Sequence, residues 1–289
     1  MDSINILDVT LRDGGYQTKF HFDNTQLSYL LNSAEQAKFE YIEVGYRNGS
    51  LRPIQNIGST GLCPNDYLER CRQHLSQCKM AVMVHPHNIT ISDIKALASC
   101  GVKLVRVCVA KNTIEKSVPI IKKCVELGLE ISVNLTRMSH YSAEEIDKTV
   151  TTVSKLPVDM VYFADSNGSM LPNQISAIYT RCAELTEVKL GFHAHDNLGL
   201  AQANSIAAIN AGAKYIDVSM AGLGKDIGNL NAELFVAYLH ALKNEKYDLD
   251  IVREASSYIR QLRQQSGTSI KEKNFSMGIA DISINELSV

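Results

Sequence analysis

The sequence carries no strong charge of either sign. Its 29 lysines and arginines nearly balance 31 aspartates and glutamates, which gives a formal net charge of -2. Proteins that bind nucleic acid or an anionic membrane usually show a basic excess, so neither partner is predicted. Long apolar runs are also missing, because none approaches the roughly 20 residues that a transmembrane helix needs. The first residues lack the basic and then apolar pattern of a signal peptide.

Cysteine pairs at metal-binding spacing are absent. The seven cysteines are odd in number, and no two are spaced as C-x-x-C. We therefore expect reduced thiols in a cytoplasmic protein and no cysteine zinc site. Low-complexity segments, charge runs and proline-rich linkers are missing too, so nothing marks a domain boundary. The 289 residues could form two domains of about 150 each. A single α/β barrel of about 250 residues fits equally well.

What the sequence does contain is a repeated alternation of strand-like and helix-like segments. Runs rich in valine, isoleucine and leucine lie near Ile4–Val9, Tyr41–Gly45, Met80–Val84, Leu104–Val109, Glu130–Leu135, Met160–Ala164, Lys189–His193 and Tyr215–Val218. Amphipathic stretches between them include Thr25–Lys38, Ile91–Cys100, Glu115–Leu127, Ala143–Lys155 and Ala201–Ala211. Apolar strands that alternate with helices indicate a parallel sheet covered by helices.

Eight such units favour closure into a barrel. We predict an α/β fold, a single-domain (β/α)8 TIM barrel over residues 1–270, with a short C-terminal tail over 271–289. The alternative is an open, doubly wound sheet, which needs a glycine-rich phosphate-binding turn after its first strand. The turn found there, Arg12-Asp13-Gly14-Gly15, carries a charged pair that does not suit a dinucleotide.

Polar residues gather where the predicted strands end, which is where barrel enzymes carry their chemistry. His193 and His195 are two residues apart on the seventh strand, so both imidazoles can face the mouth of the barrel. Taken alone, the pair is equally consistent with two histidines hydrogen-bonded to loops. Asp13 reaches the same end from the first strand, and two histidines with one carboxylate form a common open metal site. Histidine ligands favour a transition metal such as Mn²⁺ or Co²⁺ over Ca²⁺.

Further residues at the same end are candidates for binding the substrate. Arg12 is either an ion-pair partner in the barrel wall or the group that binds a carboxylate or a developing enolate oxygen. The loop G-L-G-K-D-I-G-N (222–229) misses the G-x-G-x-x-G spacing and is better suited to bringing Asn229 to the site. His85 and His87 are interpreted as loop residues. The remaining strand-end residues predicted to contact substrate are Glu43, Asn134, His140 and Ser166.

Three segments resemble one superfamily of metal-dependent aldolase and acyltransferase barrels. They are L-D-V-T-L-R-D-G-G-Y (7–16), H-A-H-D-N-L-G-L (193–200) and G-L-G-K-D-I-G-N. The superfamily includes HMG-CoA lyase, isopropylmalate synthase and 4-hydroxy-2-oxovalerate aldolase. The form D-V-T-L-R-D-G, with M-S-H at 138–140 and V-Y-F-A-D-S-N-G-S-M at 161–170, is most similar to the 4-hydroxy-2-oxovalerate aldolases. The resemblance covers roughly residues 5–240.

The resemblance implies roles for individual residues. Asp13, His193 and His195 match the metal ligands, Asn229 matches an asparagine at or near the metal, and Arg12 matches the arginine that stabilises the enolate. It implies one divalent metal, with Mn²⁺ expected first and Mg²⁺ or Co²⁺ as alternatives.

The chain also departs from the family pattern. Tyr16 stands where the aldolases have a catalytic histidine, and Asp226 stands where HMG-CoA lyases have a catalytic cysteine. The aldolases carry a C-terminal helical domain that docks an aldehyde dehydrogenase. The chain ends at Val289, too early for all of that domain, so we do not expect this partner. Family members commonly dimerise, which makes a homodimer an expectation of the same kind.

The predicted activity is class II aldol chemistry on a 4-hydroxy-2-oxo acid. A 2-oxo acid would chelate the metal, and the metal and Arg12 would stabilise the pyruvate-type enolate. Tyr16 holds the family's position for the proton-transfer base, although an ordinary tyrosine pKa near 10 is unfavourable unless the metal or Arg12 lowers it. Three alternatives stay open: a Claisen condensation of an acyl-CoA with a 2-oxo acid, a Schiff-base aldolase using Lys111, and a catalytically silent barrel.

Overall fold

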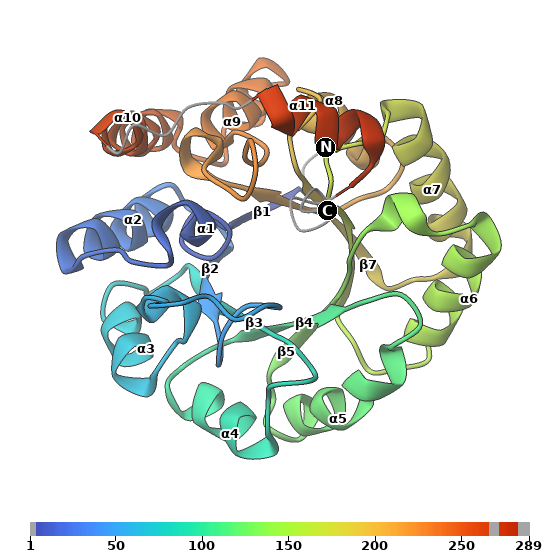
Figure 1. Ribbon diagram of the computed structural model, residues 1–289, viewed down its shortest axis with the longest axis horizontal. Helices are drawn as coiled ribbons and strands as arrows, with labels where there is room; N and C mark the ends of the chain where they lie inside the picture. The colour runs from blue at the N-terminus through green and yellow to red at the C-terminus, as the bar shows by residue number, and fades with distance from the viewer. Residues whose placement is uncertain (1–3, 266–271, 283–289) are drawn as a thin grey trace.

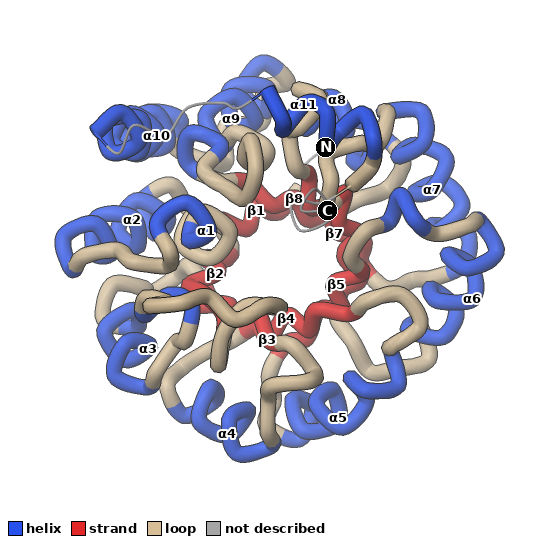
Figure 2. The backbone as a smooth tube through the Cα atoms, viewed as in Figure 1, coloured by secondary structure: helices blue, strands red, loops and turns tan. Residues whose placement is uncertain are grey.

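Eight parallel strands form a closed ring at the centre of the molecule. The structure is a computed structural model that describes residues 4–265 and 272–282. Each strand pairs with the next in sequence, and the eighth pairs with the first (Figures 1 and 2). The strands are β1 (Asn5–Asp8), β2 (Tyr41–Tyr46), β3 (Lys79–Val84), β4 (Leu104–Val109), β5 (Glu130–Leu135), β6 (Met160–Asp165), β7 (Lys189–Ala194) and β8 (Tyr215–Val218). The predicted (β/α)8 barrel is confirmed, and all eight predicted strands are present.

Helices surround this ring (Figure 2). They are α1 (Gly15–Thr18), α2 (Asn24–Gln36), α3 (Asn65–Arg72), α4 (Ile91–Ser99), α5 (Val118–Glu126), α6 (Ala143–Val153), α7 (Pro172–Leu185), α8 (Ala201–Asn210), α9 (Ala232–Ala241), α10 (Leu249–Gln265) and α11 (Glu272–Ala280). The five helices named from the sequence agree closely, except that Ile114–Ser117 forms a separate 3₁₀ turn before α5. Capping boxes at Asp23, Thr90 and Ser142 fix the starts of α2, α4 and α6. Within the described ranges, no helix is both long and apolar enough to cross a membrane.

The interior of the barrel changes from apolar to charged along the strands. Side chains alternate between the two faces of a strand, so every second residue points inward. Tyr41, Leu104 and Tyr215 belong to one buried apolar cluster inside the ring. Two residues further along the same strands come Glu43, Arg106 and Asp217, all of them buried. The apolar cluster thus supports a layer of buried charge just below the mouth.

Residues 272–282 lie near the mouth of the barrel. Helix α11 lies against the loop that joins β7 to α8. A Cβ atom on Gly278 would lie only 2.9 Å from a methyl group of Leu198, in the loop after β7, so glycine permits this close approach. Part of the segment that we predicted to be a tail is therefore a docked helix. The predicted boundary between 270 and 271 lies outside the described residues and stays a prediction.

Candidate metal centre and active site

Asp13, His193 and His195 converge at the C-terminal end of the barrel. One ligand atom from each lies within 4.8 Å of those of the other two, and all three residues are buried. The two imidazole rings come from the end of β7 and have centroids 5.0 Å apart. Asp13 comes from the turn after β1, which is adjacent to β8 in the ring and so only one strand away from β7. The structure therefore brings the three predicted metal ligands together.

The donor atoms in this cluster fit a divalent transition metal. His195 Nδ1 and Asn229 Oδ1 are buried, and neither has a hydrogen-bond partner among the described residues. Asn229 pairs with His195 in an isolated bridge, and its side-chain amide donates to the carbonyl of Leu223 at 3.3 Å, which leaves its oxygen available. Burial lowers the pKa of His195 to about 3, so its ring is neutral and can act as a ligand. Nitrogen and carboxylate donors of this kind suit Mn²⁺, Co²⁺ or Zn²⁺.

A second layer of residues orients one of these ligands. His193 Nδ1 lies 3.0 Å from a carboxylate oxygen of Asp217 on β8, which leaves Nε2 to face a metal. Arg106 on β4 donates to the same carboxylate oxygen at 2.7 Å. Sequence reasoning missed both Asp217 and Arg106. The available signal was a single charged residue in each of two otherwise apolar strand segments.

Arg12 is an ion-pair partner in the barrel wall, which is one of the two roles that the sequence left open. Its Nε donates to Glu43 at 2.6 Å, and its Nη1 donates to Asp13. Glu43 also accepts from Arg106 at 3.1 Å, so it bridges two arginines below the mouth. Nη2 of Arg12 has no hydrogen bond within the described ranges. Arg12 is thus ion-paired in the barrel wall and also lies directly beside the metal ligands.

Tyr16 lies in an aromatic cluster with Tyr46 and Phe20. Its hydroxyl is 3.3 Å from that of Tyr46, and its ring packs edge-on against Phe20 at 5.1 Å between centroids. Burial raises the pKa of Tyr16 even though Arg12 and the hydrogen bond to Tyr46 lower it. The net shift of the Tyr16 pKa is therefore upward, because burial outweighs the lowering by Arg12, and the phenol is protonated at neutral pH.

The four predicted substrate-contact residues lie at different depths. Glu43 is below the mouth, as described. Asn134 on β5 is buried and accepts from Ser132 at 2.7 Å. The Ser166 hydroxyl accepts from the backbone of Arg137 at 2.9 Å and so joins the loops after β5 and β6. His140 lies at the rim, where its Nε2 is 3.1 Å from the carbonyl oxygen of Asp281.

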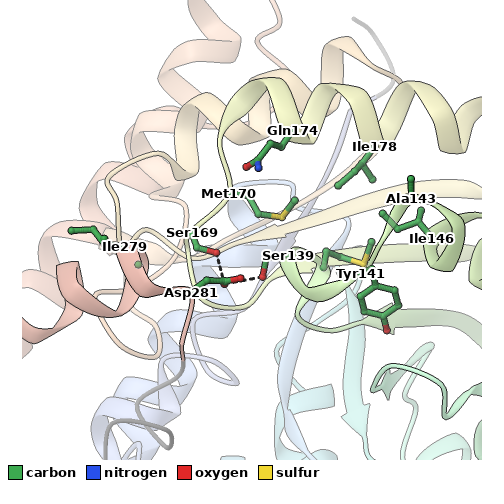
Figure 3. A pocket seen from close by; sticks show the side chains of 12 residues that line it. Ser139, Tyr141, Ala143, Ile146, Ser169, Met170, Gln174, Ile178, Ile279 and Asp281 are labelled. Carbon is green, nitrogen blue, oxygen red and sulfur yellow. Dashed lines mark hydrogen bonds between the residues drawn. The ribbon is translucent and has the colours of Figure 1, made fainter.

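A cavity of about 380 Å³ lies beside the mouth, between the loops after β5 and β6 and the end of α11 (Figure 3). Asp281 closes its polar side by accepting hydrogen bonds from Ser139 at 2.8 Å, Ser169 at 2.6 Å and Asn167 at 2.9 Å. Its apolar side includes Met170 and Ile178. None of the metal-ligand candidates lines this cavity.

The fold and the cluster together define a class of protein, a (β/α)8 barrel with a buried two-histidine, one-carboxylate site for a divalent metal. The HMGL-like family model matches residues 3–259, and the chain belongs to that family. This confirms the resemblance predicted from the sequence.

Named relatives agree with this assignment. The 4-hydroxy-2-oxovalerate aldolase of Moorella thermoacetica is 32% identical over 241 residues, covering 83% of this chain and 71% of the relative. The enzyme of the same name from Carboxydothermus hydrogenoformans is 31% identical over 284 residues, covering 96% and 83%. The prediction of a carbon–carbon lyase is confirmed at the level of the family, because these relatives are named aldolases.

Two solved structures share the fold. The N-terminal domain of a putative aldolase from Bacteroides vulgatus superposes with a TM-score of 0.88 at 27% identity, covering 98% of this chain and 95% of that one. The carboxyl transferase domain of Rhizobium etli pyruvate carboxylase gives 0.80 at 16% identity, covering 95% and 50%. The second likeness concerns the fold alone.

Proposed function

We propose that this protein is a divalent-metal-dependent aldolase that cleaves or forms a 4-hydroxy-2-oxo acid through a pyruvate-type enolate. The observation that carries the proposal is the buried cluster of Asp13, His193 and His195 with Arg12 directly beside it. The names of the relatives support the substrate class. Mn²⁺ is the proposed metal, with Mg²⁺ and Co²⁺ as alternatives.

The roles of the side chains follow from their positions. A divalent metal bound by Asp13, His193, His195 and Asn229 would supply a Lewis acid next to the 2-oxo acid. Arg12 places a fixed positive charge where negative charge develops as the C3–C4 bond breaks. Asp217 holds the His193 ring in one orientation. Tyr16 is the proposed contact to the 4-hydroxyl group, with its protonated phenol bonding to that oxygen.

The alternatives have less support. A Schiff-base aldolase would need the amine of Lys111 to attack a substrate carbonyl. That amine is instead 2.7 Å from Glu145 and donates to the carbonyl of His140 at 2.7 Å. A Claisen condensation would use the same metal centre, and the aldolase names of the relatives favour the aldol reaction over it. A catalytically silent barrel does not explain why His195 Nδ1 and Asn229 Oδ1 are buried without hydrogen-bond partners among the described residues.

Metal analysis combined with a substrate screen tests the proposal. Purified protein should hold about one equivalent of divalent metal, and His193→Ala should hold close to none. With Mn²⁺ added, mass spectrometry should detect cleavage of 4-hydroxy-2-oxo acids, beginning with 4-hydroxy-2-oxovalerate. Full activity in excess chelator would exclude the metal-dependent mechanism, and turnover of acyl-CoA with a 2-oxo acid instead would favour the Claisen reaction.

The substrates, the assembly and the cellular location of the protein are also proposals. We propose a small-molecule 2-oxo acid and an aldehyde as its partners, and a homodimer as its assembly. A cytoplasmic location fits seven cysteines that are all free thiols.

A further inference from the structure

The proposed reaction needs a proton acceptor that Tyr16 does not supply in its protonated form. Cleavage requires a group that takes the proton of the 4-hydroxyl at neutral pH. A phenol with a raised pKa can donate a hydrogen bond to that oxygen, but it has no basic form available. Another basic side chain must therefore reach the same part of the mouth.

His85 lies there. Along β3, Ala81 belongs to the apolar cluster inside the barrel and Met83 packs in the cluster with Tyr46, so the inward alternation reaches His85 next. Its ring stacks on Tyr46, with centroids 5.2 Å apart and planes at 18°. Tyr46 also contacts Arg12, whose Nη1 is 3.5 Å from the tyrosine hydroxyl. The ring of Tyr46 therefore contacts both His85 and Arg12, the residue proposed to stabilise the enolate.

One nitrogen of the His85 imidazole is buried without a hydrogen bond. The residue is 3% exposed, and its Nε2 has no hydrogen-bond partner among the described residues. Leaving a buried polar atom unpaired costs stability, so such an atom in a native site calls for a functional explanation. Burial, His87 and Arg12 lower the pKa of His85 to about 4, so the ring is neutral at pH 7 and one of its two nitrogens carries a free lone pair.

We propose that His85 is a catalytic residue that takes the proton of the substrate's 4-hydroxyl, an assignment that rests on the proposed aldolase function. As Nε2 gains the proton, the O–H electron pair becomes the second bond of the aldehyde carbonyl. The C3–C4 bond breaks, and its electron pair passes to the 2-oxo acid fragment as the enolate. The imidazolium then returns the same proton to C3. The products are an aldehyde and a 2-oxo acid, and no oxidant or external base is consumed.

Two variants separate proton transfer from structure. His85→Phe keeps an aromatic ring on Tyr46 and removes the unpaired nitrogen. We expect an unchanged or higher melting temperature, unchanged Mn²⁺ content, and a fall in kcat for aldol cleavage of about 10²–10⁴-fold. His85→Ala should show the same loss and regain at least part of it when free imidazole is added, because the small base can enter the space left by the ring.

A partial reaction and a histidine outside the site serve as controls. Decarboxylation of oxaloacetate involves no hydroxyl proton, so both variants should retain it. His74→Ala removes the same residue type from the outer helical layer, where its ring bonds Ser28 and Asn32 of α2, and it should cleave aldol substrates normally.

The outcomes distinguish this inference from the proposed function. Near-normal aldol cleavage by both His85 variants would overturn the assignment of His85 and leave the aldolase standing. Loss of decarboxylation together with cleavage, or no rescue of His85→Ala by imidazole, would show a structural role and also overturn it. A wild-type holoenzyme that decarboxylates oxaloacetate but cleaves no 4-hydroxy-2-oxo acid would overturn the proposed function, and the role of His85 with it.

Discussion

Single side chains in this site have more than one task, and Arg12 shows this most clearly. It neutralises Asp13 and Glu43, and it is also the residue that we propose stabilises the enolate. Arg12→Lys keeps the charge but loses the planar fork that can bond two acceptors at once. We expect normal metal content and a fall in kcat/KM of about 10²–10³-fold, the usual cost of losing one donor that stabilises a transition state. Steady-state kinetics beside metal analysis will show it, and near-normal kcat/KM would make Arg12 a structural ion pair.

Tyr16 is one of the two residues at which we predicted a departure from the family pattern. Tyr16→Phe removes only the phenolic oxygen and retains the packing on Phe20 and Tyr46. Aldol cleavage should fall by about 10²–10³-fold, because the substrate oxygen loses a hydrogen-bond donor that stabilises its developing charge. Oxaloacetate decarboxylation should persist. Both rates should be measured in one preparation, so that their ratio does not depend on the amount of folded protein. If Tyr16→Phe retains both reactions equally, Tyr16 is only a packing residue.

At the scale of elements, the loop after β8 positions Asn229. A Cβ atom at Gly224 would lie 2.4 Å from the Asn229 amide nitrogen and 2.7 Å from its oxygen. Gly224→Ala should therefore push the Asn229 side chain away and weaken Mn²⁺ binding about tenfold or more, with little loss of fold. Metal titration will measure it. In an Asn229→Ala background the same change should have little further effect, and an additive double mutant would contradict this coupling.

Helix α11 is tied to the barrel through Asp281. Burial alone would raise the pKa of this carboxyl, but hydrogen bonds from Ser169, Asn167 and Ser139 hold it below its usual value. A carboxyl whose pKa is lower in the docked state stabilises docking above its ordinary pKa of 3.8, and this contribution is lost as pH falls through the lower value.

Hydrogen exchange can test this contact. Amides of α11 should exchange faster in Asp281→Ala than in the wild type at pH 7, because the loops after β5 and β6 no longer hold the segment. Acidification below about pH 4 should reduce the difference between the two proteins. Equal exchange rates at pH 7 would show that packing around Gly278 alone holds the helix.

At the scale of the whole molecule, buried charges join opposite walls of the barrel. Arg106 on β4 bonds Glu43 on β2 and Asp217 on β8, and it lies 4.4 Å from the centre of the Tyr162 ring on β6. Arg106→Leu would leave two buried carboxylates uncompensated, at a cost of about 3–5 kcal/mol in the free energy of unfolding. Urea denaturation measures this. Arg253→Leu, which breaks an exposed pair with Asp250, should change stability by no more than about 1 kcal/mol.

The sequence was sufficient for the ring of strands and for the convergence of Asp13, His193 and His195. Both follow from local pattern and from the rule that chemistry occupies the strand ends. Arg106 and Asp217 were missed because a lone charge in an apolar strand gives no sign of what it pairs with across the barrel. Docking of α11 depends on contacts such as Asp281 with Ser139, which are 142 residues apart. Burial decides the protonation of Tyr16 and His85, and local sequence does not report it.

The closure of the ring also determines when the site can assemble during translation. Asp13 is translated 212 residues before Lys225, yet its carboxylate accepts from the backbone N–H of Lys225 at 3.0 Å. His193, His195 and Asp217 likewise come long after Asp13 in the sequence. While those residues are being made, the nascent chain carries Asp13 and Arg12 without the groups that complete the site. The proposed metal centre can form only when β7 and β8 have emerged from the ribosome and joined β1, so metal binding would begin with the closure of the barrel.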